Sequence, residues 1–353
     1  MILSLVLTVV DLFLLKPLLT LYGANTENMG YALEYSTVIV SGAFFFLLAQ
    51  TTNSLLKGMG YAKRAFINLL LSIIVNTILD PIFIFVFKWG VLGAALSTVV
   101  GNVVSAILAI QFLCSKKSAA HIKLVNMKLE ASTIKTIISI GTPACVTQIG
   151  LSLISLTYNH VANNIGGSGA VAAYGIIYSV IMLVYMPVLG LGQGIQPIFG
   201  YNYGSKNFER VKQILKHSIT YATVFCIIMF AIIEIFSGTI TTLLGGKSDP
   251  ELIAMATNGL RLFSLSLPVV GFQMIGTNYF QYVGKFKNSV ILSVLRQFIL
   301  PIPLIFILAN FLGLTGIWIA APIADFISFI VTALFIKNEI CRINQGELLK
   351  GVS

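Results

Sequence analysis

The sequence has 353 residues, of which 57% are hydrophobic and only 10% are charged, whereas a soluble globular domain carries about 25% charged residues. The mean hydropathy is +0.93, and the apolar runs are long and continuous, which indicates a lipid environment and disfavours the short alternating strands of a barrel. Backbone groups in lipid must be paired within the segment, so helices remain. The net charge of +10 indicates basic cytoplasmic loops, not nucleic-acid binding.

Ten apolar segments are long enough to cross a bilayer, which takes about 20 residues per span. The connections between them alternate, one set carrying most of the Lys and Arg residues and the other set almost none. Because basic loops stay in the cytoplasm, we expect the basic set and both termini there. The expected spans are 1–22, 31–56, 65–87, 91–113, 134–159, 169–198, 213–243, 252–282, 288–311 and 315–337.

An internal repeat relates the two halves of the chain. Gly60 matches Gly284, and the pair Gly90 and Gly93 matches Gly313 and Gly316, at offsets of 223 or 224 residues. The second half holds six expected spans and the first only four, so a helix pair and part of a third helix lack a counterpart. Halves with an even number of spans share one orientation, which predicts parallel repeats with the substrate between them.

We therefore expect an all-α polytopic membrane protein with two lobes. The predicted organisation is an incomplete N-terminal lobe (1–115), a cytoplasmic linker (116–133), a C-terminal lobe (134–340) and a cytoplasmic tail (341–353).

The segment from Gly190 to Gly204, GLGQGIQPIFGYNYG, followed by SKNFERV, carries a family resemblance. Together with Pro143, the stretch 166–175 and the stretch 76–81, it resembles the multidrug and toxic compound extrusion (MATE) family, and most closely its MepA-type multidrug exporters of Gram-positive bacteria. The resemblance covers essentially the whole chain. It implies twelve helices in two six-helix lobes, so ten are expected here, numbered three to twelve, in a bacterial cell (inner) membrane.

Polar residues in the outer half of the first lobe predict a cation or proton site. Asn76 and Asp80 lie one turn apart on one helix face, and Tyr35 and Thr98 reach a similar depth on two other spans. A carboxylate with neutral oxygen partners can hold sodium or accept a proton. The resemblance implies the same network with an additional aspartate on the family's first helix. That aspartate has no counterpart here, which leaves coupled transport by this truncated form open.

The drug-binding pocket is expected to be apolar with a few polar groups, because methionine and aromatic faces adapt to varied ligands and attract lipophilic cations. The candidate substrate-binding residues are Gln148, Tyr178, Met182, Gln193, Gln196, Gln273 and Tyr279.

Charged residues inside spans need partners in lipid. Glu234 and Arg261 lie at similar depth on adjacent spans, as do Arg296 and Asp325, and each couple is expected to form an ion pair with a structural role first and a gating role second.

We predict a secondary antiporter that exports lipophilic or cationic drugs in exchange for protons or sodium, acting as a monomer and without a cofactor. The alternative is a lipid-linked oligosaccharide flippase of the same superfamily, which would need a cationic cavity. An enzyme is disfavoured because the sequence holds no HExxH, GxSxG or aspartate-rich motif. The four cysteines are far apart and no histidine has ligand spacing, so no metal site is expected.

Overall fold

The structure is a computed structural model that describes residues 2–21, 29–115, 118, 130–246 and 249–345. Helices account for nearly all of these residues, and no strand occurs among them. The predicted all-helical class is therefore confirmed. The predicted linker 116–133 lies mostly outside the described residues, as does most of the predicted tail 341–353. The chain forms two compact units, which we call the N-terminal unit (Met1–Lys128) and the C-terminal unit (Leu129–Ser353).

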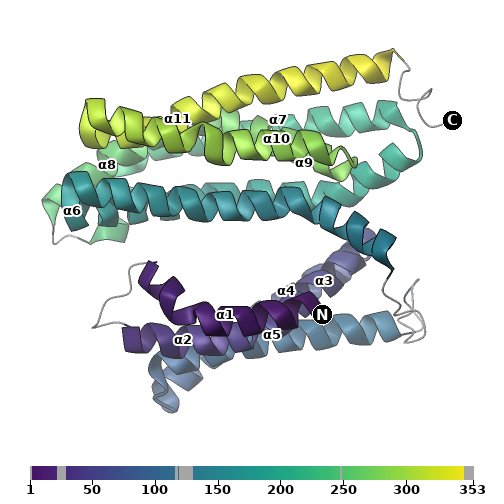
Figure 1. Cartoon of the computed structure of the whole chain (residues 1–353), viewed down its shortest axis with the longest axis horizontal. Coiled ribbons are helices and arrows are strands. Elements are labelled where there is room, and N and C mark those ends of the chain that lie inside the picture. Colours follow the sequence, from purple (N-terminus) through teal and green to yellow (C-terminus); the bar gives the residue numbers. More distant parts are fainter. Residues whose placement is uncertain (1, 22–28, 116–117, 119–129, 247–248, 346–353) are drawn as a thin grey trace. The chain divides into compact units, whose positions relative to one another are not determined.

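The N-terminal unit is built around α5, which packs against α2, α3 and α4 (Figure 1). Small residues at this contact allow the close approach: a Cβ atom on Gly101 would lie 2.9 Å from the carbonyl oxygen of Ser72 on α4. The elements are α1 (Ile2–Leu21), α2 (Met29–Ser41), α3 (Ala43–Gly58), α4 (Ala62–Pro81), the π-helical turn η1 (Ile82–Val86) and α5 (Gly90–Cys114).

The C-terminal unit packs its helices around two large buried clusters of apolar side chains. Among the helices of this unit, α7 and α9 make the most extensive contact, and α6 and α11 run along the unit beside them (Figure 1). The elements are α6 (Ala131–Gly204), α7 (Phe208–Gly245), α8 (Pro250–Ser264), α9 (Leu267–Tyr282), α10 (Phe286–Val294), the π-helical segment η3 (Leu295–Ile299) and α11 (Pro301–Asn344).

Two of these helices are too long for one span and are broken by glycine. Gly167 in α6 has φ 63° and ψ −156°, and Gly313 in α11 has φ 58° and ψ −136°. This backbone region is open to glycine and strained for other residues. Each break therefore separates two spans, as the sequence predicted at 159–169 and 311–315.

The sequence repeat is also a structural repeat within the two units. The turn at Gly60 has φ 87° and that at Gly284 has φ 80°, and each is closed by a 2.8 Å backbone hydrogen bond from the next residue, Tyr61 to Leu56 and Lys285 to Phe280. The bends match as well, because α2 and α3 meet at 45° around residue 42 and α8 and α9 meet at 52° around residue 265. Both bends sit at the same 223-residue offset.

The described helices carry the apolar lengths that membrane spans require. Five of them are long and apolar enough to cross a membrane, and seven qualify if each bent pair counts as one span. Large apolar side chains cover their outer faces, such as Phe13, Phe85 and Leu183. Such continuous exposed apolar surface suits contact with lipid tails.

Candidate functional site

The N-terminal unit holds a polar cluster between α4 and α5. The carboxylate of Asp80 accepts a hydrogen bond from the hydroxyl of Ser97. One turn earlier on α4, the amide of Asn76 donates to Ser97 Oγ at 3.3 Å and to Thr98 Oγ1 at 3.4 Å. Ser97 is fully buried, whereas the other three residues are half-buried. The structure thus places a carboxylate beside two hydroxyls and an amide, which are oxygen and nitrogen groups able to share a proton or surround a small cation.

Three of the four residues predicted for this cluster lie together. Tyr35 lies on α2 with 39% of its surface exposed, and among the described residues it makes no hydrogen bond to the other three. Ser97 was missed by the sequence analysis, although it directly precedes Thr98.

Further along the same contact, α4 carries more buried polar groups at a four-residue spacing. Ser72 donates to the carbonyl of Gly101 at 2.7 Å. Asn68 donates to Asn53 Oδ1 at 3.1 Å, and Asn53 donates to Ser105 Oγ at 3.0 Å. The polar face of α4 is therefore continuous along its contact with α3 and α5.

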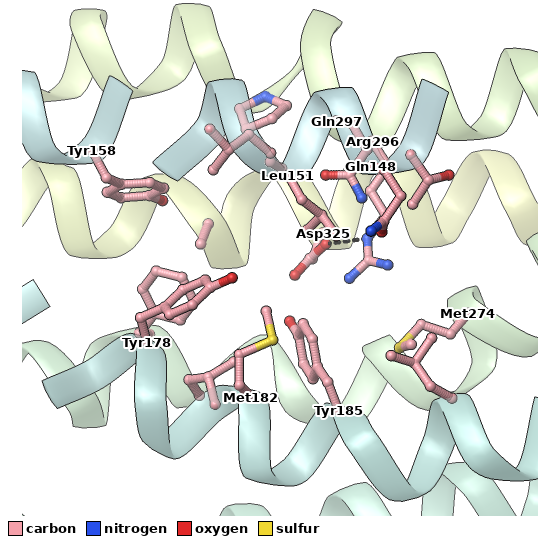
Figure 2. A pocket seen from close by; sticks show the side chains of 18 of the residues that line it. Gln148, Leu151, Tyr158, Tyr178, Met182, Tyr185, Met274, Arg296, Gln297 and Asp325 are labelled. Carbon is pink, nitrogen blue, oxygen red and sulfur yellow. Dashed lines mark hydrogen bonds and ion pairs between the residues drawn. The ribbon is translucent and has the colours of Figure 1, made fainter. Parts of the chain in front are cut away.

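The C-terminal unit contains a cavity of about 170 Å³ between α6, α8, α9, η3 and α11. Figure 2 shows two walls facing each other: Tyr178, Met182 and Tyr185 lie on one, and Gln148 and Asp325 lie on the other. The cavity is lined by Thr147, Gln148, Leu151, Ile154, Tyr158, Tyr174, Tyr178, Ile181, Met182, Tyr185, Leu189, Phe263, Met274, Arg296, Gln297, Pro301, Ala321, Ala324 and Asp325.

Aromatic rings dominate one end of this cavity. The rings of Tyr158 and Tyr174 stack at 4.8 Å between centroids with an interplanar angle of 10°. Tyr178 and Phe263 lie at their edges, with centroids 5.9 Å from Tyr174 and 5.8 Å from Tyr158. The hydroxyl of Tyr158 is buried without a hydrogen-bond partner in the described structure. Stacked rings with a free polar tip offer both apolar area and an attractive face for a cation.

An ion pair lies within the same cavity. Arg296 Nε donates to Asp325 Oδ1 at 3.1 Å, and both side chains are largely buried, with 15% and 11% of their surface exposed. The ion pair predicted from their positions in apolar spans is therefore confirmed. The guanidinium carbon of Arg296 also lies 5.9 Å from the ring centre of Tyr185.

The second predicted ion pair was wrong. Arg261 donates its Nε to Ser237 Oγ at 2.7 Å, and Glu234 accepts from Ser264 Oγ at 2.8 Å. No ion pair joins these two described side chains. Each charge instead bonds a serine hydroxyl on the facing helix: Ser237, one turn after Glu234 on α7, bonds Arg261, and Ser264, one turn after Arg261 on α8, bonds Glu234.

The seven predicted substrate-binding residues divide into two groups. Gln148, Tyr178 and Met182 line the cavity. Gln193 and Gln196 lie exposed on the last part of α6, and Gln273 is buried with no partner for either amide atom in the described structure. These three and Tyr279 do not line the cavity, and their role in substrate binding stays a prediction.

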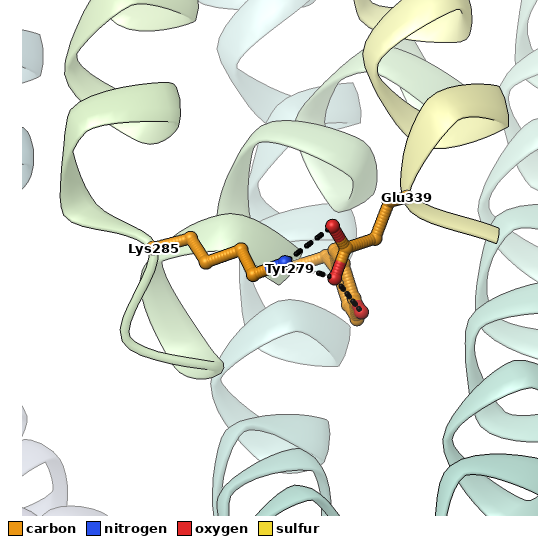
Figure 3. A network of polar contacts seen from close by, with 3 residues as sticks. All are labelled: Tyr279, Lys285 and Glu339. Carbon is orange, nitrogen blue, oxygen red and sulfur yellow. Dashed lines mark hydrogen bonds and ion pairs between the residues drawn. The ribbon is translucent and has the colours of Figure 1, made fainter. Parts of the chain in front are cut away.

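Tyr279 instead belongs to a charged network at one end of the unit (Figure 3). Lys285, in the turn after α9, donates to Glu339 Oε1 at 2.7 Å, and the Tyr279 hydroxyl donates to the same oxygen at 3.4 Å. Glu339 is only 3% exposed. This network ties the end of α9 to the last turns of α11 and was missed by the sequence analysis.

No group of three or more His, Cys, Asp or Glu side chains that could hold a metal ion occurs among the described residues. The helical bundle with its exposed apolar faces, its structural repeat and its aromatic cavity defines a polytopic membrane protein of the transporter type.

The chain belongs to the MatE family, whose profile matches residues 1–82 and 143–307. Among similar proteins are the Multidrug export protein MepA of Staphylococcus saprophyticus and that of Staphylococcus aureus, each 27% identical over 99% of this chain and 77% of the relative.

Solved structures of the family are similar over most of the chain. A MATE protein in complex with MaL6 has a TM-score of 0.90 at 28% identity, covering 98% of this chain and 77% of that one. An outward-facing multidrug resistance MATE family transporter has a TM-score of 0.89 at 27% identity, with the same coverage. A Pyrococcus furiosus transporter of the MOP superfamily, described as having a binding pocket of reverse polarity, has a TM-score of 0.91 at 27% identity, covering 97% and 77%.

Proposed function

We propose that this chain is an exporter of lipophilic, cationic small molecules in a bacterial cell membrane. The observation that carries the proposal is the cavity of the C-terminal unit, whose tyrosines and Met182 surround a buried carboxylate. Aromatic faces and flexible thioethers suit cations of varied shape. The similarity to multidrug export proteins over 99% of the chain supports the same substrate class.

Asp80 is the proposed coupling group of the antiport. Its carboxylate accepts from Ser97, with Asn76 and Thr98 beside it. A carboxylate surrounded by neutral oxygens can exchange a proton or a sodium ion as its surroundings open and close. Either ion fits this chemistry, and no cofactor is required.

The alternative function, flipping of a lipid-linked oligosaccharide, would require an anion-binding cavity. The cavity here has Arg296 as its cationic residue, and Asp325 neutralises that residue at 3.1 Å. This charge balance favours the export of cations over the transfer of an anionic lipid.

Orientation follows from the charge of the loops. The basic connections lie in the cytoplasm with both termini. We also propose that the protein acts as a monomer, because a single chain contains both the proposed cavity and the coupling group.

Dye export tests this function. The full chain is expressed in a bacterial strain that lacks its own major efflux pumps, and the efflux of a fluorescent lipophilic cation is followed after energisation. We expect efflux above the empty-vector level, its loss in Asp80→Asn, and its reduction in Tyr178→Ala. Tyr221→Ala, an exposed tyrosine on α7 outside the cavity, is the matched control. An active Asp80→Asn variant at equal expression would remove Asp80 from the coupling mechanism.

A further inference from the structure

The Arg296–Asp325 ion pair stands inside the cavity that a substrate would enter (Figure 2). Charged side chains inside membrane spans are rare, pair with one another, and mark substrate or ion pathways. Here one residue of the pair comes from η3 and the other from α11, and both line the cavity beside Tyr185 and Met182. A substrate in the cavity must therefore meet the pair.

The guanidinium of Arg296 occupies the surroundings that suit a foreign cation. A carboxylate lies on one side, bonded at 3.1 Å. The ring of Tyr185 lies on another, 5.9 Å from the guanidinium carbon. A lipophilic cation is attracted by the same two features, a negative charge in a region of low dielectric and an aromatic face.

The backbone that carries Arg296 is not a regular α-helix. η3 is a π-helical segment, and such segments occur often at functional sites, where they interrupt the regular helical register. The neighbouring residue Gln297 is packed tightly: a Cβ atom on Gly150 of α6 would lie 2.4 Å from Gln297 Cβ. Gln297 is therefore held against α6, while the side chain of Arg296 extends into the cavity.

We infer that Arg296 is a built-in competitor for the cation-binding position of this cavity, and that a cationic substrate binds Asp325 and Tyr185 by displacing the guanidinium. The inference rests on the proposed cationic substrate class. It makes Asp325 a substrate-binding residue and Arg296 the residue that sets cation affinity. An exporter must also release its substrate, and the return of the Arg296 guanidinium to the Asp325 carboxylate favours that release.

The displacement also keeps the buried carboxylate compensated in both states. An unpaired carboxylate in an apolar region is costly. In the empty cavity Arg296 neutralises Asp325, and in the loaded cavity the substrate does so. A neutral molecule of the same shape cannot take over this role, so the pair selects for positive charge.

Equilibrium binding of tetraphenylphosphonium to the purified full chain tests the inference. We expect Arg296→Met to bind this cation more tightly than the parent chain by about tenfold, equivalent to 1.4 kcal/mol, because Asp325 loses its internal partner. Asp325→Asn is expected to bind about tenfold more weakly. The double variant is expected to return towards the parent affinity, so the two changes act with opposite sign.

Two controls separate this outcome from general damage to an ion pair. Lys285→Met and Glu339→Gln break a second ion pair of the described part of this unit, which lies outside the cavity, and are expected to leave the affinity within about twofold. Arg296→Gln keeps a hydrogen-bond donor and removes the charge, so it should also increase the affinity for tetraphenylphosphonium, by a smaller factor. This variant keeps the test valid if Arg296→Met folds poorly.

Equal losses of affinity in Arg296→Met, Arg296→Gln and Asp325→Asn would overturn the inference, as would the absence of binding in every variant. The proposed function is judged separately by dye efflux of the parent chain. Efflux together with equal binding losses removes only the competitor role. Opposite binding effects without efflux remove only the export function.

Discussion

At the scale of single residues, Ser97 is the closest partner of the proposed coupling carboxylate. It is fully buried between α4 and α5 and donates its hydroxyl to Asp80. A hydrogen bond to a charged group contributes about 1.5–3 kcal/mol. Ser97→Ala is therefore expected to change the half-saturating concentration of the driving cation in dye efflux by about 10- to 100-fold, while the protein still reaches the membrane.

Ser115→Ala is the matched control for this prediction. Its hydroxyl bonds the carbonyl of Phe112 at the end of the same helix, away from Asp80. Parent-like ion dependence in Ser97→Ala would show that the hydroxyl has only a packing role.

The sequence could predict part of this cluster but not all of it. The four-residue spacing of Asn76 and Asp80 places both on one face of any helix, so their meeting could be predicted. Ser97 and Thr98 are adjacent hydroxyls, and which of them faces Asp80 depends on how α5 is rotated against α4. Packing at Gly101 and Ser72 fixes that rotation, and no local pattern reveals it.

The prediction of ion pairs from the sequence is limited in the same way, because it depends on packing between helices. Arg296 and Asp325 could be predicted as a pair because both need compensation in lipid. The identical argument failed for Glu234 and Arg261, since Ser264 and Ser237 satisfy them. A rule that counts only charges overlooks hydroxyls within reach.

At the scale of helices, the contact between α7 and α9 depends on Gly271. An added Cβ atom there would lie 2.6 Å from the backbone oxygen of Ala222 and 2.8 Å from the nitrogen of Thr223. The added Cβ atom would force the backbones of the two packed helices to move apart, so Gly271→Ala is expected to destabilise the protein by about 1–3 kcal/mol. The thermal unfolding midpoint of the purified chain in detergent measures this.

Gly238→Ala is the appropriate comparison, because a Cβ atom at this position on α7 meets nothing within 4 Å. Alanine is the better helix former by about 1 kcal/mol, so this variant should be at least as stable as the parent. Equal unfolding midpoints for the two variants would mean that the contact between α7 and α9 accommodates an added Cβ atom at Gly271, which would contradict the expected destabilisation.

The network of Lys285, Glu339 and Tyr279 fixes a different part of the helix packing. Glu339 is buried, so Glu339→Gln leaves the Lys285 ammonium without its countercharge and is expected to lower stability by about 1.5–3 kcal/mol. Glu209→Gln removes the partner of Lys212 in an exposed pair, where Glu209 is 78% exposed, and should change stability by less than about 1 kcal/mol. The two unfolding midpoints are compared in the same detergent. A smaller effect from Glu339→Gln than from Glu209→Gln would contradict a stabilising role.

At the scale of the whole molecule, the sequence predicted the spans well because lipid imposes a simple rule. Apolar length located ten expected spans, and helical structure lies under each of them in the described residues. The π-helical segments η1 and η3 carry no comparable signal, because each is a single short turn with i→i+5 hydrogen bonds that interrupts an otherwise regular apolar helix. The cavity could be predicted only in part: Gln148, Tyr178 and Met182 line it, but η3 and α11 supply other lining residues from distant parts of the chain, and no local pattern shows that these parts meet.

Topology is the property of the whole chain that charge decides, and it can be tested directly. The connection at residues 58–62 is followed by the basic pair Lys63 and Arg64, whereas α8 begins with Asp249 as its N-cap and Glu251 in its first turn. Basic segments are retained in the cytoplasm during insertion. In a background without the four native cysteines, we expect a membrane-impermeant maleimide to label Glu251→Cys in intact cells and Lys63→Cys only after permeabilisation.

Both positions are exposed in the structure, so a lack of labelling reports the membrane and not burial. Labelling of both sites after permeabilisation is the control for reactivity. The reverse pattern would place the basic connections outside and would put Asp80 in the cytoplasmic half of α4. A coupling carboxylate there would take up its ion from the cytoplasm, against the direction that an exporter driven by an inward ion gradient requires. The labelling result therefore decides whether the proposed antiport can run with Asp80 as its ion-accepting group.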